Sequence, residues 1–157
     1  MSMRSMLAEV SRTHYPNAPA TPAQLAAFEA HVGWELDKDL RAFYLHCDGG
    51  TLFETRNNAN YRFLPLAEIR RARLAIRASD EDEDGAPSVY TLVDMQDSDF
   101  IVLDVAQRIA GSYPLFDAWH ETFPVVERIA SSFGEFLEKA LRSGNRSFWL
   151  SSAPPER

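Results

Sequence analysis

The segment 21–50 constrains the fold most, because it carries the start and stop signals of two successive helices. In the first helix, Thr21 and Gln24 form a capping box, and Pro22 occupies the first helical position, where its missing N–H costs nothing. Leucine, phenylalanine and valine then recur at helical spacing up to Gly33, a residue that readily adopts the left-handed stop. The pattern predicts an amphipathic helix over 21–32.

The second helix is predicted to begin after Asp37, a favourable N-cap. Apolar residues follow at i, i+3, i+4 and i+7, the spacing of one buried helical face: Leu40, Phe43, Tyr44 and Cys47. Asp48-Gly49-Gly50 then ends the helix, since glycine reaches positive φ without a steric penalty.

His46, Cys47 and Asp48 are the residue types of a thiol protease or a metal site. However, consecutive helical residues point about 100° apart, so His46 is poorly placed to activate Cys47. A catalytic Cys–His pair is usually assembled from distant parts of a chain. Because Cys47 lies on the apolar stripe, we interpret it as a structural cysteine.

The remainder of the chain predicts short strands followed by a closing helix. Strands are expected at 51–55 and 61–65, a helix at 66–78, a hairpin formed by 88–95 and 99–105, one or two strands in 108–117, and a helix from Ser132 to Gly144. Helices, then a strand meander, then a helix indicate an α+β fold rather than repeated βαβ units. We divide the chain into a helix and linker at 1–20, a domain at 21–143 and a loosely held tail at 144–157.

Composition excludes several classes of protein. The net charge is −7, from 23 acidic and 16 basic residues, which disfavours binding to nucleic-acid phosphates. One cysteine cannot form an internal disulfide framework, and there is neither an apolar run long enough to span a membrane nor a signal peptide pattern. We therefore expect a cytoplasmic protein. Motifs for nucleotides, redox cofactors or serine hydrolases are missing, so we predict no cofactor, no metal and no catalytic residue.

Two groups of carboxylates are candidates for function. Asp80, Asp82 and Asp84 resemble the first half of a calcium loop, but Thr91 stands where the bidentate glutamate is needed. A solvated loop that attracts a basic partner is the better interpretation. Asp94, Asp97 and Asp99 form either a polar hairpin turn or, less favourably, an acid–base site.

An aromatic segment, 113–124, contains Asp117, Trp119, His120 and Glu121. His120-Glu121 lacks the second histidine of a zinc-protease helix. The segment is therefore either core or a partner-binding surface, since tryptophan is frequent in both. The four arginines of the predicted helix 66–78 favour a solvated face: Arg70, Arg71, Arg73 and Arg77.

The order of these elements resembles the SMI1/KNR4 family, also called the SUKH superfamily. The resemblance rests on the stretches 20–50, 63–69 and 132–141, with family markers at Glu29, Gly33, Trp34, Leu36, Asp48, Gly49, Gly50, Phe133 and Phe136. It implies an α+β domain with a central, largely antiparallel sheet and helices packed against it. Many bacterial members are similar to immunity proteins that neutralise a cognate toxin, often a nuclease, and the family has no established catalytic residues.

This resemblance implies an immunity protein that covers the cationic cleft of a toxin, in agreement with the acidic charge. We predict that the partner-binding residues are Asp80, Asp82, Asp84, Asp94, Asp97, Asp99, Asp117, Trp119 and Glu121. A regulatory or scaffold module that binds proteins is the alternative. A third hypothesis is an enzyme that uses Asp94–Asp99 or His120–Glu121, which requires a deep pocket where these side chains converge.

Overall fold

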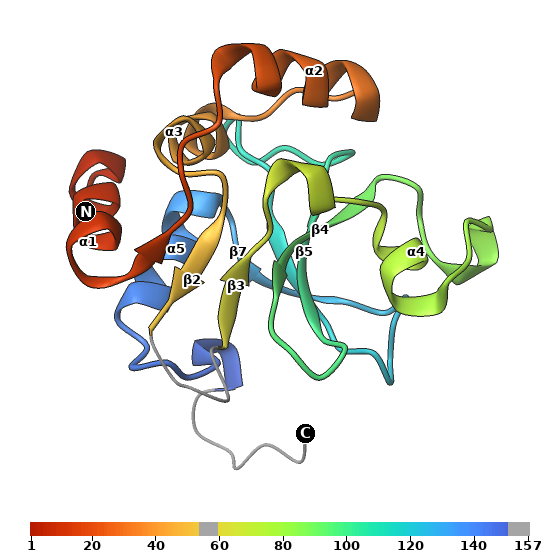
Figure 1. Ribbon diagram of the computed structural model, residues 1–157. Coiled ribbons are helices and arrows are strands. Elements are labelled where there is room, and N and C mark those ends of the chain that lie inside the picture. Colours follow the sequence, from red (N-terminus) through yellow and green to blue (C-terminus); the bar gives the residue numbers. More distant parts are fainter. Residues whose placement is uncertain (54–59, 151–157) are drawn as a thin grey trace.

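The computed structural model describes residues 1–53 and 60–150, which form one antiparallel sheet with helices packed against it (Figure 1). Seven strands lie side by side in chain order: β1 (Tyr15–Pro16), β2 (Gly50–Leu52), β3 (Tyr61–Phe63), β4 (Val89–Asp94), β5 (Phe100–Asp104), β6 (Leu115–Ala118) and β7 (Glu127–Ala130). Every neighbouring pair is antiparallel. The predicted α+β fold with a central antiparallel sheet is confirmed.

The helices are α1 (Met3–Thr13), α2 (Pro22–Val32), α3 (Lys38–His46), α4 (Ala72–Arg77) and α5 (Phe133–Leu141), with short 3₁₀ turns at Leu66–Glu68, Asp82–Asp84 and Phe148–Leu150. Helices α1, α3 and α5 contact one another, whereas α4 lies on the other side of the sheet (Figure 1). The larger core lies with α1, α3 and α5, and includes Phe43, Phe63 and Phe133 in mutual ring contact.

Successive side chains of the central strands point to opposite faces of the sheet, so each face has a hydrophobic core. In β5, Ile101 and Leu103 point into the larger core, while Val102 joins a smaller one with Ala72 of α4 and Phe123. The smaller core is the reason that the segment after β6 folds back over the sheet beside α4, rather than projecting into solvent.

The cap signals of the first two predicted helices are confirmed. Thr21 Oγ1 accepts a hydrogen bond from Gln24 N at 3.1 Å, and Gln24 Oε1 accepts one from Thr21 N at 2.8 Å. Asp37 Oδ1 accepts a hydrogen bond from Leu40 N at 3.0 Å. The predicted apolar residues of α3 are buried, and Cys47, which follows α3 with an extended backbone, is 0% exposed.

The stop after α3 is the junction between helix and sheet. Gly49 has φ +78°, and a Cβ built on it would lie 2.4 Å from the main-chain oxygen of Phe63. Asp48 Oδ1 accepts a hydrogen bond from Leu66 N at 2.8 Å, which joins the end of α3 to the turn after β3. Glycine is therefore required at position 49 both by conformation and by space.

Two predictions about the ends of elements were wrong. The expected helix 66–78 is broken into a 3₁₀ turn and α4, because Ile69, which is buried in the larger core, has an extended backbone and Arg71 is not helical either. The expected loose tail is partly packed, since Phe148 and Trp149 contact the ring of Phe136.

Two strands were not predicted from the sequence. Strand β1 pairs with β2 immediately after α1, and β7 forms the other edge of the sheet. The end of the expected strand 51–55 falls within residues 54–59, which lie outside the described residues, as do positions 151–157 of the tail.

Candidate functional site

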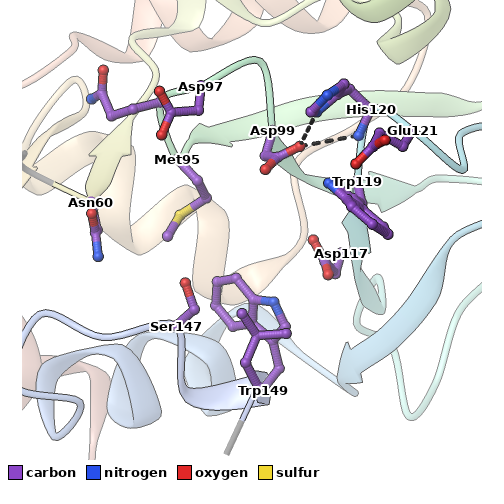
Figure 2. Close-up of a pocket in the computed structure, with 12 residues that line it drawn as sticks. Asn60, Met95, Asp97, Asp99, Asp117, Trp119, His120, Glu121, Ser147 and Trp149 are labelled. Carbon is purple, nitrogen blue, oxygen red and sulfur yellow. Dashed lines mark hydrogen bonds and ion pairs between the residues drawn. The ribbon is translucent and has the colours of Figure 1, made fainter. Parts of the chain in front are cut away.

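Five of the nine predicted partner-binding residues lie around one hollow of about 300 Å³ (Figure 2). Four segments line it: Asn60 just before β3, the turn between β4 and β5, the end of β6 with the residues that follow, and the C-terminal 3₁₀ turn with Ser147 before it. The five predicted residues there are Asp97, Asp99, Asp117, Trp119 and Glu121. Met95, Trp149 and Ser147 also line the hollow and were not predicted.

The strand register explains why these side chains converge. Phe100 of β5 pairs with Ala118 of β6, so the residues just outside this pair, Asp99 and Trp119, emerge at the same end of the sheet. Asp99 Oδ1 lies 2.8 Å from His120 Nδ1 and accepts a hydrogen bond from His120 N at 3.0 Å. The turn between β4 and β5 is therefore fastened to the segment after β6.

The turn interpretation of Asp94, Asp97 and Asp99 is confirmed. Asp94 Oδ1 accepts a hydrogen bond from Gln96 N at 2.8 Å, a local contact typical of aspartate in turns. Asp97 has φ +54° and an exposed side chain. Asp94 itself does not line the hollow. Its Oδ2 lies 3.8 Å from Arg62 Nη1.

A second hollow, of about 330 Å³, adjoins the first at Asp117 and Trp119. Its remaining lining comes from Thr122, Val125, Val126 and Glu127. Val125 is 71% exposed, an unusual state for a large aliphatic side chain. Trp119 thus lies between an acidic hollow and a second one lined by both valines and carboxylates, so this aromatic side chain has mixed surroundings.

Arg77 of α4 holds the segment that carries Trp119. Its Nη2 donates to the carbonyl oxygens of His120 at 2.5 Å and Phe123 at 2.7 Å, and its guanidinium lies 5.8 Å from the centre of the Phe123 ring. The predicted solvated arginine face is therefore wrong for Arg77, which positions the segment 119–123.

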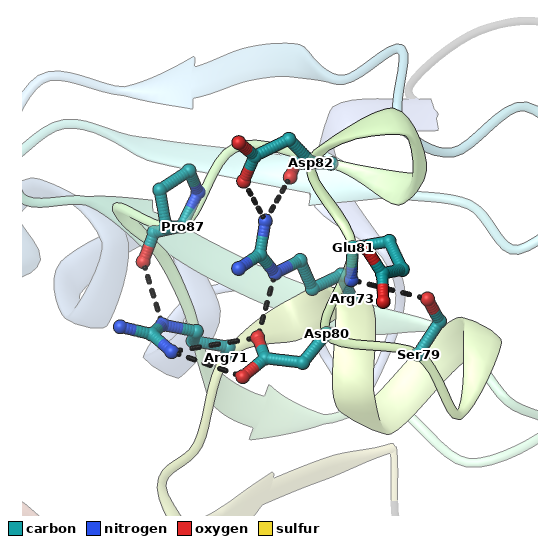
Figure 3. A network of polar contacts seen from close by, with 8 residues as sticks. Arg71, Arg73, Ser79, Asp80, Glu81, Asp82 and Pro87 are labelled. Atoms are coloured by element: carbon teal, nitrogen blue, oxygen red, sulfur yellow. Dashed lines mark hydrogen bonds and ion pairs between the residues drawn. The ribbon is translucent and has the colours of Figure 1, made fainter.

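The acidic loop 79–87 lies elsewhere, and two of its carboxylates are paired with arginines of this chain (Figure 3). Arg73 is only 4% exposed; its Nε lies 2.8 Å from Asp80 Oδ1, and its Nη1 lies 2.7 Å from Asp82 Oδ1 and 2.9 Å from Gly85 O. Arg71 Nη1 adds a contact of 3.2 Å to Asp80 Oδ2. The loop is solvated as predicted, since most of its residues are exposed, but a buried guanidinium also orders it, which was not predicted.

This arrangement separates Asp80, Asp82 and Asp84 from the hollow beside Trp119. Arg73 supplies the positive charge that a calcium ion would bring, and Asp82 to Asp84 form a 3₁₀ turn rather than a ligand loop. Within residues 1–53 and 60–150, no group of three or more histidine, cysteine, aspartate or glutamate side chains could hold a metal ion. Among the same residues, no helix is long and apolar enough to cross a membrane.

The ion pair with Arg73 predicts an acid-dependent loss of stability. Hydrogen bonding from Arg73 lowers the pKa of Asp80 below its usual value of 3.8. A carboxylate with a lowered folded-state pKa contributes stability above its unfolded pKa and loses it as the pH falls through the folded value. We expect wild type to be more stable than Asp80→Asn at about pH 6, with the difference shrinking toward about pH 2.5 in urea titrations. Glu83→Gln, on the same loop but without an ion pair among the described residues, is the control, and a pH-independent difference would contradict the assignment.

Cys47 has the properties of a structural thiol. Burial, with a smaller contribution from the Asp48 carboxylate, raises the pKa of the Cys47 thiol from 9.0 to about 12. His46 instead faces Ser11, whose Oγ lies 2.6 Å from His46 Nε2. At pH 8 we expect the folded protein to react with a thiol reagent at least about a thousandfold more slowly than the protein unfolded in guanidinium. Rapid labelling of the folded protein would contradict this assignment.

The family markers have structural roles away from the hollow. Glu29 Oε2 accepts a hydrogen bond from Leu36 N at 2.8 Å and lies 2.7 Å from Arg41 Nη2, so it joins α2 to α3. Trp34 packs edge-on against Phe28, Tyr90 and Tyr113. These contacts explain why Glu29, Trp34 and Leu36 are informative about the fold rather than about a binding surface.

Trp149 is the unpredicted residue of most interest in the hollow. Its Nε1 is buried, and the described residues offer it no hydrogen-bond acceptor. A buried donor that stays unpaired costs about 1–3 kcal/mol. No motif marked Trp149, because its position depends on packing of the C-terminal turn against Phe136 of α5.

The comparisons with known proteins agree with the fold and its markers. The chain is 28% identical over 118 residues to the immunity protein YokJ of Bacillus subtilis (strain 168), an alignment that covers 74% of this chain and 71% of that protein. The sequence profile of the SMI1 / KNR4 family (SUKH-1) matches residues 19–139, from just before α2 into α5. The chain therefore belongs to the SMI1/KNR4 family (SUKH-1).

Proposed function

We propose that this chain is an immunity protein that binds one cognate toxin and blocks it by covering its active cleft. The similarity to immunity protein YokJ, together with the membership of this chain in the SMI1/KNR4 family, carries this proposal. The net charge of −7 supports a basic partner such as a nuclease domain, because opposite charges steer such partners together. The function is one of binding rather than catalysis, and it would be exercised in the cytoplasm.

The surface on either side of Trp119 is the proposed contact with the toxin. Asp97 and Glu121 are exposed at its rim, and Val125 supplies an exposed apolar contact. Tryptophan is the residue most often found to dominate binding energy when it lies near the centre of an interface. The loop 79–87 is less suited, since Asp80 and Asp82 are already paired with Arg73.

Co-expression with the toxin tests the function directly. The candidate toxin is the product of the gene immediately upstream, expressed in a sensitive bacterial host with and without this chain. We expect growth to be restored at equal expression. Continued killing, with both proteins present at equal levels, would show that the chain does not neutralise that toxin.

A regulatory or scaffold module is the alternative function. It predicts that affinity purification returns endogenous regulators of the host rather than a toxin, and that the neighbouring gene encodes no toxic product.

A further inference from the structure

The acidic hollow beside Trp119 is too small for a folded element of a partner. At about 300 Å³ it lies at the lower end of the range for small-ligand pockets, roughly 300–1,000 Å³, so it has room for one long side chain. Carboxylates from two segments face it, and no lysine or arginine is among the described residues that line it. The charge of the hollow therefore favours a cation.

The walls of the hollow are aromatic as well as acidic. Trp119 and Trp149 both line it, together with Met95 (Figure 2). Indole rings are the best partners for cation–π contacts, and a guanidinium can both stack on a ring and donate two parallel hydrogen bonds to a carboxylate. Arginine fits this combination better than lysine, whose ammonium is compact and strongly hydrated.

The Nε1 of Trp149 is a separate observation at the same wall. It is a buried donor for which the described residues offer no acceptor, in a side chain that lines the hollow together with four carboxylates. An arginine residue of a partner brings acceptors as well as a cation, because its main-chain carbonyl oxygens accompany the side chain.

We propose that this hollow receives one arginine side chain of the partner, with the guanidinium against Trp119 and facing the carboxylates of Asp97 and Glu121. The proposal rests on the proposed function in taking the partner to be the toxin, and it names the side chain that the toxin inserts. Arg77, which fixes the segment 119–123 through two carbonyl oxygens, is a positioning residue for the pocket.

The experiment titrates the full chain with N-acetylarginine amide and follows the indole N–H signals of the tryptophans and the Met95 methyl signal by NMR. N-acetylcitrulline amide is the matched neutral probe. We expect saturable shifts with a dissociation constant of about 1–10 mM for the arginine probe, as for a single-residue ligand, and none for the citrulline probe. The double variant Asp97→Asn/Glu121→Gln should bind at least about fivefold more weakly, and the control Glu83→Gln should bind as wild type does.

Several results would overturn the proposal: equal shifts with both probes, no shifts with either, unchanged affinity in the double variant, or shifts that follow protein concentration and so report self-association. The experiments distinguish an error in the arginine-pocket assignment from an error in the proposed immunity function. If the chain neutralises the toxin but binds no arginine probe, only the pocket assignment fails. If it binds the arginine probe but gives no protection, the pocket stands and the toxin assignment fails.

Discussion

Replacement of Gly49 by alanine is expected to lower the free energy of unfolding by about 3–5 kcal/mol. The φ of +78° is costly for any residue with a Cβ, and this Cβ would lie 2.4 Å from Phe63 O and 2.8 Å from Pro65 N. Both obstacles are main-chain atoms of the β3 junction, so they cannot move aside as a flexible side chain would. Urea denaturation of the purified variant measures the loss.

Gly33→Ala is the matched control for this prediction. Gly33 has a similar φ of +82°, but nothing lies within 4 Å of the position that its Cβ would occupy. Gly33→Ala should therefore lower the free energy of unfolding only by the conformational cost of a positive φ, about 1–2 kcal/mol. Equal losses in the two variants would show that the close approach of β3 to Gly49 is unimportant for stability.

Replacement of Trp119 by alanine is expected to weaken binding to the toxin by about 2–4 kcal/mol, roughly 30- to 1,000-fold. The side chain is partly buried between two hollows, so its loss removes a wall from both. Unchanged circular dichroism and an unchanged unfolding midpoint would show that the effect is local. Calorimetric titration with the purified toxin domain measures the affinity.

A pair of charge reversals locates the binding surface independently of Trp119. Asp97→Lys and Glu83→Lys change the net charge by the same amount, and both positions are exposed. They therefore alter long-range steering similarly but differ in location. We expect Asp97→Lys to weaken binding at least about tenfold more than Glu83→Lys. The reverse order would place the interface on the loop 79–87.

The helices flanking Gly33 and Gly49 could be predicted because their signals are local. Capping boxes, a proline at the first turn and glycine stops act within a few residues, so they are readable without tertiary information. The break before α4 was missed because it depends on the burial of Ile69 against distant elements. Strand β7 was missed because only Ala130 of its four residues is buried, which leaves little alternation.

Individual members of the candidate site could be predicted, but their grouping could not. Asp97, Asp99 and Trp119 are conspicuous in the sequence, yet only the pairing of Phe100 with Ala118 brings them to one end of the sheet. Dependence on tertiary contacts also explains why Arg73 was predicted to be solvated but is buried. The clustering of four arginines in one predicted helix favoured a solvated face, whereas Asp80 and Asp82 provide the charges that permit the burial of Arg73.

The central claim is that the chain blocks its toxin by forming a complex, and titration of toxin activity tests this most directly. Toxin at a fixed concentration well above the dissociation constant is mixed with increasing amounts of the chain, and the remaining activity is measured. We predict a linear fall that reaches zero at one chain per toxin. Loss of toxin activity at far lower ratios would indicate a catalytic mechanism, and undiminished activity at excess chain would contradict the account altogether.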